Sequence, residues 1–359
     1  MSEHVPEPHA DRELRGLAAL TDLASRSLGG SVVAANDDLF ADRRNLVTPG
    51  PPAWHPDAYG PVGKTYDGWE TRRRRGEGAG GDGTGPESDY AIVRLGAPGV
   101  VRHVVVDTAF FRGNYPPYGS VEALAWDGHP AAEDLVAAEW TPLVPKSPPK
   151  GDVANAFDVA DPRRWTHVRL SIYPDGGVSR LRVLGDVVPN PRLLTGTVDL
   201  AALENGGRVT GCSDMFYASA ANLIRPGAAR VTGDGWENAR RRGAGNDWVL
   251  FRLAAPGRPR RVELDTTHFI GNAPAAARVL GIDGRAHEVG HDADGPGWRE
   301  LLPRTRLQPD TRHVFALDAA GPPVEPVTHV RLDVYPDGGL SRVRVWGEID
   351  GAALAALPR

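Results

Sequence analysis

The segment at 173–179 reads Tyr-Pro-Asp-Gly-Gly-Val-Ser, and it recurs almost unchanged at 335–341 as Tyr-Pro-Asp-Gly-Gly-Leu-Ser. Other matches follow in the same order, among them Asp-Gly-Trp-Glu at 67–70 and 234–237. The chain therefore carries two copies of one unit of roughly 160 residues, which is too long for a solenoid repeat and has the length of a whole domain. Each copy is large enough to bury a core of its own.

The repeat predicts where the domains begin and end. We expect a first β-sandwich repeat at 19–188 and a second at 198–349, joined by a linker at 189–197 that contains Pro189 and Pro191. Residues 1–18 and 350–359 are predicted to be terminal tails.

Short alternating segments separated by Gly and Pro indicate the fold class. Strands are predicted at 90–95, 103–107 and 167–173, and Pro-Asp-Gly-Gly is typical of a tight hairpin turn. Many short strands without long alternating helices predict an all-β protein of two tandem jelly-roll sandwiches. A short helix is expected at the start of each domain, at 22–28 and 199–204, because an Asp stands at each N-cap position and Gly-Gly follows. Residues 352–357 are a third helix candidate.

Composition excludes several classes of protein. The chain is 41% hydrophobic and 24% charged, and its net charge of -5 lacks the basic excess of a nucleic-acid-binding protein. No apolar run reaches membrane-spanning length, and residues 1–15 lack the apolar core of a signal peptide. The single cysteine, Cys212, excludes an intramolecular disulfide and suits a reducing compartment. We therefore expect a cytoplasmic protein with no membrane or nucleic-acid partner.

Four motifs carry a resemblance to a known family. They are Asp-Gly-Trp-Glu-Thr-Arg-Arg-Arg-Arg at 67–75, Phe-Arg-Gly-Asn-Tyr-Pro at 111–116, Leu-Leu-Pro-Arg-Thr at 301–305 and the two Tyr-Pro-Asp-Gly-Gly segments. Over nearly its whole length, from Leu20 to Gly347, the chain resembles the allantoicases. This resemblance implies two galactose-binding-like jelly-roll domains. It also implies a hydrolase of carbon-nitrogen bonds in linear amidines, which converts allantoate and water to ureidoglycolate and urea in purine degradation. We also expect a homo-oligomer.

The two copies differ at these motifs. In the second copy Ala239 replaces the first arginine of the run, and the 111–116 motif becomes Phe-Ile-Gly-Asn-Ala-Pro at 269–274. The second domain has thus lost a cation and an aromatic ring. A single working site, in the first domain or assembled across both, is therefore favoured over two equivalent sites.

The chemistry of allantoate selects candidate residues. Its carboxylate suits an arginine fork, and expulsion of urea requires a proton donor and then a base that guides water to the carbon. We expect catalysis by Glu70, with Asp67 or Asp107 as a second carboxylate, and substrate binding by arginines and neighbouring polar groups. These substrate-binding candidates are Arg73, Arg75, Arg112, Asn114 and Tyr115.

Structural alternatives stand beside these roles. Alternate residues of a strand face opposite ways, so at most two arginines of 72–75 can serve one pocket. Asp107 follows an apolar strand and can simply accept a turn hydrogen bond. Trp69 can be a buried turn residue. The Pro-rich aromatic loop at 47–63, which the second copy lacks, is either a pocket wall or a surface excursion.

The residues identify no metal site or other cofactor. The histidines are scattered without a ligand spacing such as His-x-His, and an oxygen-rich manganese or calcium site at a loop cluster is left open. Two rival functions are also left open, because a fold alone does not establish an activity. They are a non-catalytic ligand-binding sandwich and a hydrolase or lyase acting on a related ureide such as ureidoglycolate.

Overall fold

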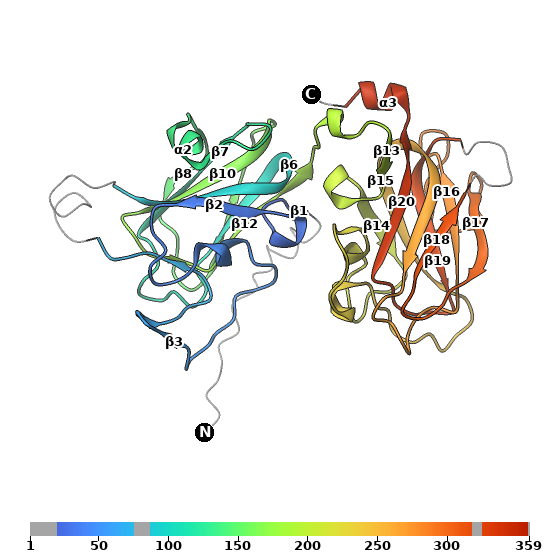
Figure 1. Ribbon diagram of the computed structural model, residues 1–359, viewed down its shortest axis with the longest axis horizontal. Coiled ribbons are helices and arrows are strands. Elements are labelled where there is room, and N and C mark those ends of the chain that lie inside the picture. Colours follow the sequence, from blue (N-terminus) through green and yellow to red (C-terminus); the bar gives the residue numbers. More distant parts are fainter. Residues whose placement is uncertain (1–19, 75–86, 318–324, 358–359) are drawn as a thin grey trace. The chain divides into compact units, whose positions relative to one another are not determined.

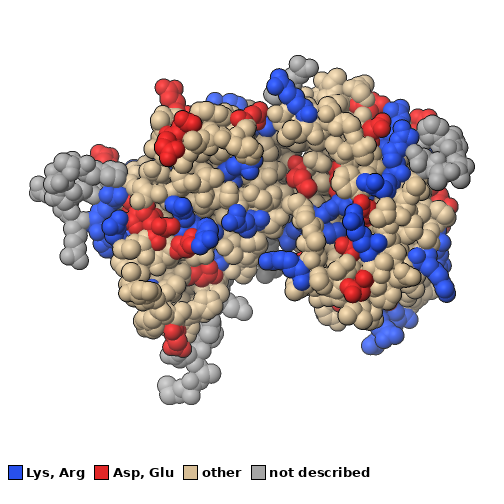
Figure 2. All heavy atoms as spheres, in the orientation of Figure 1, with Lys and Arg blue, Asp and Glu red and all other residues tan. Residues whose placement is uncertain are grey.

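The computed structural model describes residues 20–74, 87–317 and 325–357. The chain divides into two compact units, Met1–Val188 and Pro189–Arg359, each built mainly of strands (Figure 1). None of the described helices is both long and apolar enough to cross a membrane. On the face shown in Figure 2, basic and acidic side chains are interspersed.

The first unit is an antiparallel sandwich organised around one long strand. This strand, β6 (Asp89–Asp107), pairs with β10, β12, β2 and β9, and the sheet order is β1-β12-β6-β10-β7-β8. Its other elements are β1 (Thr21–Asp22), η1 (Arg26–Leu28), β2 (Ser31–Ala35), η2 (Arg43–Val47), β3 (Tyr59–Gly60), β4 (Gly63–Lys64), β5 (Trp69–Glu70), β7 (Tyr118–Leu124), α2 (Ala132–Ala137), β8 (Thr141–Ser147), β9 (Ala154–Asp158), β10 (Arg164–Tyr173), β11 (Gly177–Val178) and β12 (Arg180–Val187).

The second unit repeats, strand for strand, the eight-stranded sheet of the first unit. The long strand β15 (Asp247–Asp265) takes the place of β6, and the order is β13-β20-β15-β19-β16-β17 with β14 and β18 also on β15. The all-β prediction of two tandem sandwiches is therefore confirmed. The remaining elements are η3 (Pro191–Leu193), β13 (Thr197–Asp199), η4 (Leu203–Asn205), β14 (Arg208–Cys212), η5 (Ala220–Ile224), η6 (Thr232–Asp234), β16 (Ala276–Ile282), β17 (Arg299–Arg306), β18 (Arg312–Ala316), β19 (Val327–Tyr335), β20 (Arg342–Ile349) and α3 (Gly351–Ala355).

Strand alternation separates a core face from a polar face in each unit. In β6, Val104 and Val106 enter the core, so Asp107 lies on the opposite face beside Arg180 of β12. The same register in the second unit sends Val262 and Leu264 inward. Charged side chains therefore gather on the polar face of each sandwich, next to the last residues of β6 and β15.

The Tyr-Pro-Asp-Gly-Gly segment is not the predicted hairpin. Strands β10 and β12 flank this segment in the chain. In the sheet they do not pair with each other, because β6 lies between them and pairs with both. The segment instead runs from the first residue of β6, where the Asp89 N–H donates to the Pro174 carbonyl, to its last residue, where the Asp107 carbonyl accepts from the Ser179 N–H. Between these two points its Gly177 pairs with Glu70 of β5. A Cβ atom on Gly177 would lie 2.0 Å from the ring of Phe111, so this position requires glycine. The prediction failed because turn residues mark a change of direction but do not identify the partner strands.

The predicted opening helices are present as single 3-10 turns that start later than expected. They are η1 and η4, and Ser25 caps the first of them. Asp22 does not cap a helix, because its carboxylate accepts the N–H groups of Ala24 and Val183 at 3.2 and 3.1 Å and joins β1 to β12. The C-terminal helix α3 lies where the third candidate was placed, although it ends at Ala355.

Candidate active site

Glu70 is positioned by a two-residue strand at one end of the first sandwich. Its strand β5 pairs with β11 on one side, and Glu70 forms an isolated bridge with Ala41 on the other. The neighbouring Trp69 is fully buried, and its indole donates to the Asp37 carbonyl at 2.8 Å. Because adjacent strand residues face opposite ways, burial of Trp69 directs Glu70 away from the core.

Glu70 forms one group with two of the predicted substrate-binding residues. The side-chain amide of Asn114 donates to Oε1 of Glu70 at 2.7 Å. Burial raises the pKa of the Glu70 carboxyl, and the Asn114 hydrogen bond and the Arg73 charge partly oppose this rise. Protonated Glu70 is thus favoured relative to a free glutamate, which is the state that a proton donor requires.

Arg73 links this group to the Tyr-Pro-Asp-Gly-Gly segment. Its guanidinium donates to Asp175 at 3.0 Å and to the Gly113 carbonyl at 3.4 Å, and about half of its side chain is exposed. Asp175 was not predicted, because its residue type was explained by the turn alone. The signal that could have found it is the arginine run, which needs a carboxylate partner.

The other arginines of the run have separate positions. Arg72 pairs with Asp37, and Arg74 pairs with the buried Asp89, so both anchor the chain. Arg75 lies outside the described residues.

Asp67 and Asp107 belong to a second group around Arg180. Asp67 accepts from Nη2 of Arg180 and from the Ala53 N–H, both at 2.7 Å. Asp107 accepts the Ala109 N–H at 2.9 Å, and burial raises the pKa of its carboxyl. Within the described residues, neither carboxylate is hydrogen bonded or ion paired to Glu70.

Arg112 and Tyr115 lie against the loop at 150–152. Nε of Arg112 donates to Asp152 at 2.9 Å, and its side chain is mostly exposed. The Tyr115 ring covers Gly151, where an added Cβ would lie 2.4 Å from the ring. Arg112 is therefore placed at the surface with its charge already paired.

The aromatic loop at 47–63 packs beside the Asp-Gly-Trp-Glu motif. Trp54 lies 5.5 Å from Phe110 between ring centroids, and the ring of Tyr66 stacks on Phe111 at 4.9 Å. Burial, followed by the Glu70 charge, raises the pKa of Tyr66, so this ring lies within the field of the catalytic candidate. This arrangement favours the pocket-wall interpretation of the loop.

The second unit retains part of the Glu70 arrangement. Asn272 donates to Glu237 at 2.6 Å, as Asn114 does to Glu70. The aromatic wall is missing, because Gly233 stands where the first unit has Tyr66 and Ala273 stands where it has Tyr115.

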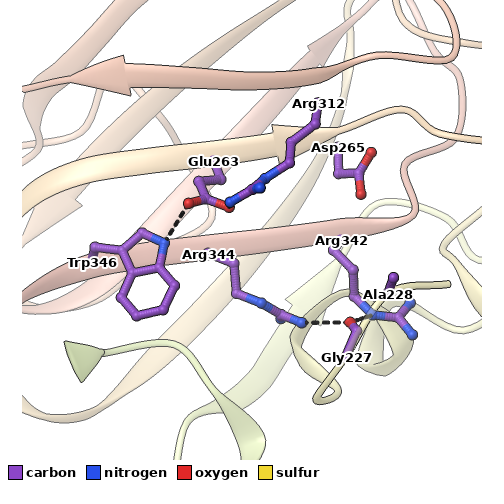
Figure 3. Close-up of a pocket in the computed structure, with 8 residues that line it drawn as sticks. All are labelled: Gly227, Ala228, Glu263, Asp265, Arg312, Arg342, Arg344 and Trp346. Atoms are coloured by element: carbon purple, nitrogen blue, oxygen red, sulfur yellow. Dashed lines mark hydrogen bonds and ion pairs between the residues drawn. The ribbon is translucent and has the colours of Figure 1, made fainter.

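A pocket of about 280 Å³ that the sequence did not reveal lies on the polar face of β15, β18 and β20 in the second unit (Figure 3). It is lined by Gly227, Ala228, Glu263, Asp265, Arg312, Arg342, Arg344 and Trp346. The sequence signal that could have revealed this pocket is the set of polar or aromatic residues that replace apolar ones in the second copy. Glu263, Arg312 and Trp346 stand where the first copy has Val105, Ala154 and Leu184.

Metal-binding side chains are not gathered in the part of the chain that the structure describes. Across residues 20–74, 87–317 and 325–357, no cluster of three or more His, Cys, Asp or Glu side chains could hold an ion.

Comparison with known proteins identifies the family. The allantoicase repeat model matches residues 21–188 and 198–350. A probable allantoicase of Nocardia farcinica is 54% identical over 96% of this chain and 99% of the relative, and an allantoicase of Dictyostelium discoideum is 39% identical over 90% and 86%. The crystal structure of Saccharomyces cerevisiae allantoicase superposes with a TM-score of 0.74 at 31% identity, covering 93% of this chain and 97% of that one. The chain belongs to the allantoicase family and has the hydrolase activity of that family.

Proposed function

We propose that this chain hydrolyses allantoate to ureidoglycolate and urea at the Glu70 group of the first unit. The observation that carries this placement is the half-buried Glu70, whose pKa is raised by burial and whose carboxyl accepts from the Asn114 amide and feels the charge of Arg73. A carboxyl with a raised pKa next to a cation and an amide suits proton transfer to a charged, amide-bearing substrate.

The proposed roles follow from the bonds that each group can make. Arg73 binds the substrate carboxylate, and Asn114 orients a ureido group. Glu70 donates a proton to the ureido nitrogen that leaves, so the bond from this nitrogen to the α-carbon breaks and urea departs. The lone pair of the second ureido nitrogen then forms a double bond to the α-carbon, and water adds to this carbon to give ureidoglycolate. The carboxylate that accepts a proton from the water is Asp67 or Asp107.

Urea release from allantoate tests this placement. Glu70→Gln keeps the side-chain shape and removes the proton, so we expect a loss of roughly 10²- to 10⁴-fold in kcat. Glu237→Gln is the matched control in the second unit and should retain activity. Equal losses in the two variants would contradict a catalytic centre in the first unit. Parallel assays with added manganese, with calcium and with chelator test whether the reaction needs a divalent metal ion, which is the alternative that the sequence leaves open.

We also propose a cytoplasmic homo-oligomer. The single cysteine, Cys212, supports the cytoplasmic location, since a reducing compartment offers no disulfide stabilisation. The assembly is supported by Met215, Phe216 and Tyr217, which are 56%, 71% and 66% exposed in succession and form an apolar surface suited to a second copy. Sedimentation of wild type and Phe216→Ser measures the assembly, and a monomeric wild-type chain would reject it.

A further inference from the structure

Arg180 and Arg342 occupy the same position in the two units. Each begins the strand after the Tyr-Pro-Asp-Gly-Gly segment, and each pairs in register with the last residue of the long strand, Asp107 or Asp265. Both are buried, at 1% and 7% exposure. Nη1 of each donates to a carbonyl of the Asp-Gly-Trp-Glu motif, that of Asp67 at 3.0 Å or Asp234 at 2.7 Å. The two guanidinium groups therefore have the same anchoring at Nη1, and Nε of Arg342 has a further acceptor in the Gly227 carbonyl at 3.0 Å.

The carboxylate that binds the guanidinium of the first arginine binds a different residue in the second unit. Asp67 holds Nη2 of Arg180 at 2.7 Å. The matching Asp234 instead accepts from the N–H and Nε of Arg230, at 3.0 and 3.2 Å. The described hydrogen bonds of Arg342 use only its Nε and Nη1. Its Nη2 is thus the donor of a buried cation with no protein acceptor among the described residues, on a side chain that lines the 280 Å³ pocket.

The strands beside Arg342 carry further groups for a ligand, since Asp265 pairs with Arg342 on one side and with Arg312 on the other. Arg312 donates Nε and Nη2 to Glu263 at 2.9 and 2.6 Å, which leaves its Nη1 for another acceptor. Asp265 uses Oδ1 for the N–H and hydroxyl of Thr267, at 2.9 and 2.6 Å, which leaves Oδ2 as an acceptor. The pocket therefore presents two guanidinium donors and one carboxylate acceptor.

The fold itself does not require this polar wall. The first unit builds the same strands with Val105, Ala154 and Leu184 at the positions of Glu263, Arg312 and Trp346. Glu263 is only 5% exposed, and desolvation of such an ion pair opposes folding. A set of polar groups that costs stability and is not needed by the architecture indicates a binding role.

We infer that this pocket is a second ligand site, which binds a small carboxylate bearing ureido groups, the chemical class of the substrate and product of this chain. The ligand carboxylate takes the position that Asp67 occupies in the first unit and accepts from Nη2 of Arg342, while a ureido carbonyl accepts from Nη1 of Arg312, whose guanidinium points away from that of Arg342 (Figure 3). A ureido N–H donates to Oδ2 of Asp265. The volume is close to the lower end of small-molecule pockets, roughly 300 Å³, which suits a ligand of this size. The site does not depend on where the hydrolysis takes place.

Calorimetric titration with ureidoacetate tests this site without turnover, because the α-carbon of this probe bears only one ureido group. We expect a binding event that Arg342→Lys weakens about tenfold to a hundredfold, since lysine lacks the planar fork. Arg312→Ala should weaken the same event. Because the Arg312 side chain is mostly exposed, this variant should fold, so it tests the site even if the Arg342 variant misfolds. Arg180→Lys is the matched control and should leave it unchanged, because Asp67 already occupies that guanidinium.

Each outcome decides the inference. Unchanged affinity in both Arg342→Lys and Arg312→Ala would overturn it, and so would loss of the event in Glu70→Gln, which would place the probe in the first unit. Equal affinity for acetate and ureidoacetate would reject the ureido contact with Asp265. Urea release by the Glu70 variant decides the catalytic proposal separately, so the two proposals can fail independently.

Discussion

The carboxylate of Asp67 lies 2.7 Å from Nη2 of Arg180, a side chain with 1% exposure that crosses from β12 to the Asp-Gly-Trp-Glu motif. This ion pair fixes the residues that precede Glu70. In the second unit, Asp234 pairs instead with Arg230, whose side chain is 87% exposed. One duplicated motif thus has a structural ion pair in one copy, and in the other an arginine whose hydrogen bonds to described residues all go to backbone carbonyls.

Removal of Asp67 should destabilise the first unit far more than the matching change destabilises the second. Asp67→Ala leaves Arg180 as a buried cation without its anion, so we expect a loss of about 3 kcal/mol in the free energy of unfolding. Asp234→Ala removes a pair with an exposed arginine and should cost about 1 kcal/mol or less. Urea unfolding of both variants measures the difference, and similar losses would show that the Arg180 pair is not the anchor described above.

Removal of Asn114 should shift the pH dependence of catalysis. The Asn114 hydrogen bond stabilises ionised Glu70 and lowers its pKa, so Asn114→Ala should raise this pKa further above 4.5. If Glu70 acts as the general acid, the limb of the kcat profile that falls with rising pH moves to higher pH. Asn272→Ala makes the same change beside Glu237 and should leave the profile in place. A shift to lower pH in Asn114→Ala would rule out this role of the amide.

The raised pKa of Glu70 also has a consequence for stability. The folded chain binds the Glu70 proton more tightly than the unfolded chain does, so the contribution of this group is fully present below pH 4.5 and is lost as the pH rises through the folded pKa. Between pH 4 and pH 8 the wild type should therefore lose more stability than Glu70→Gln, because the variant lacks this titrating group. Chemical unfolding at the two pH values provides this comparison.

His167 should make the first unit sensitive to mild acid. It is 1% exposed, and burial lowers its pKa from 6.5 to about 4, with the charges of Arg94 and His129 acting in the same direction. The unfolded chain binds this proton more tightly, so stability is lost as the pH falls from 6.5 to about 4, by up to about 3 kcal/mol. His167→Gln should flatten the dependence of the urea midpoint on pH over this range. His103→Gln, at a partly exposed ring beside Asp158, is the control.

Much of the architecture could be predicted because duplication and strand alternation are local properties of the chain. The strands predicted at 90–95 and 103–107 are both present, joined in the single strand β6. The buried state of Trp69 also followed from its place in a turn motif. Such predictions succeed because side-chain direction in a strand depends on the position of the residue alone.

The site could be predicted only in part. The contact of Asn114 with Glu70 joins residues 44 positions apart, and Asp175 reaches Arg73 across 102 positions. Both partners were visible as residue types, but only Asn114 lies in a motif that suggested a function. Asp175 was explained by its turn, and the residues around Arg342 come together only because β18 and β20 both pair with β15 in the folded sheet.

The sequence by itself determined two sandwiches of one topology, their family and the residues able to handle a carboxylate and a proton. The tertiary structure decided which of these residues meet. The Tyr-Pro-Asp-Gly-Gly segment illustrates the division, since its residue types predict a turn whereas its path between the two ends of β6 places Gly177 against Glu70. Ion pairs depend on side-chain directions over a few ångströms, so the partners of Arg180 and Arg342 differ although their local sequences nearly coincide.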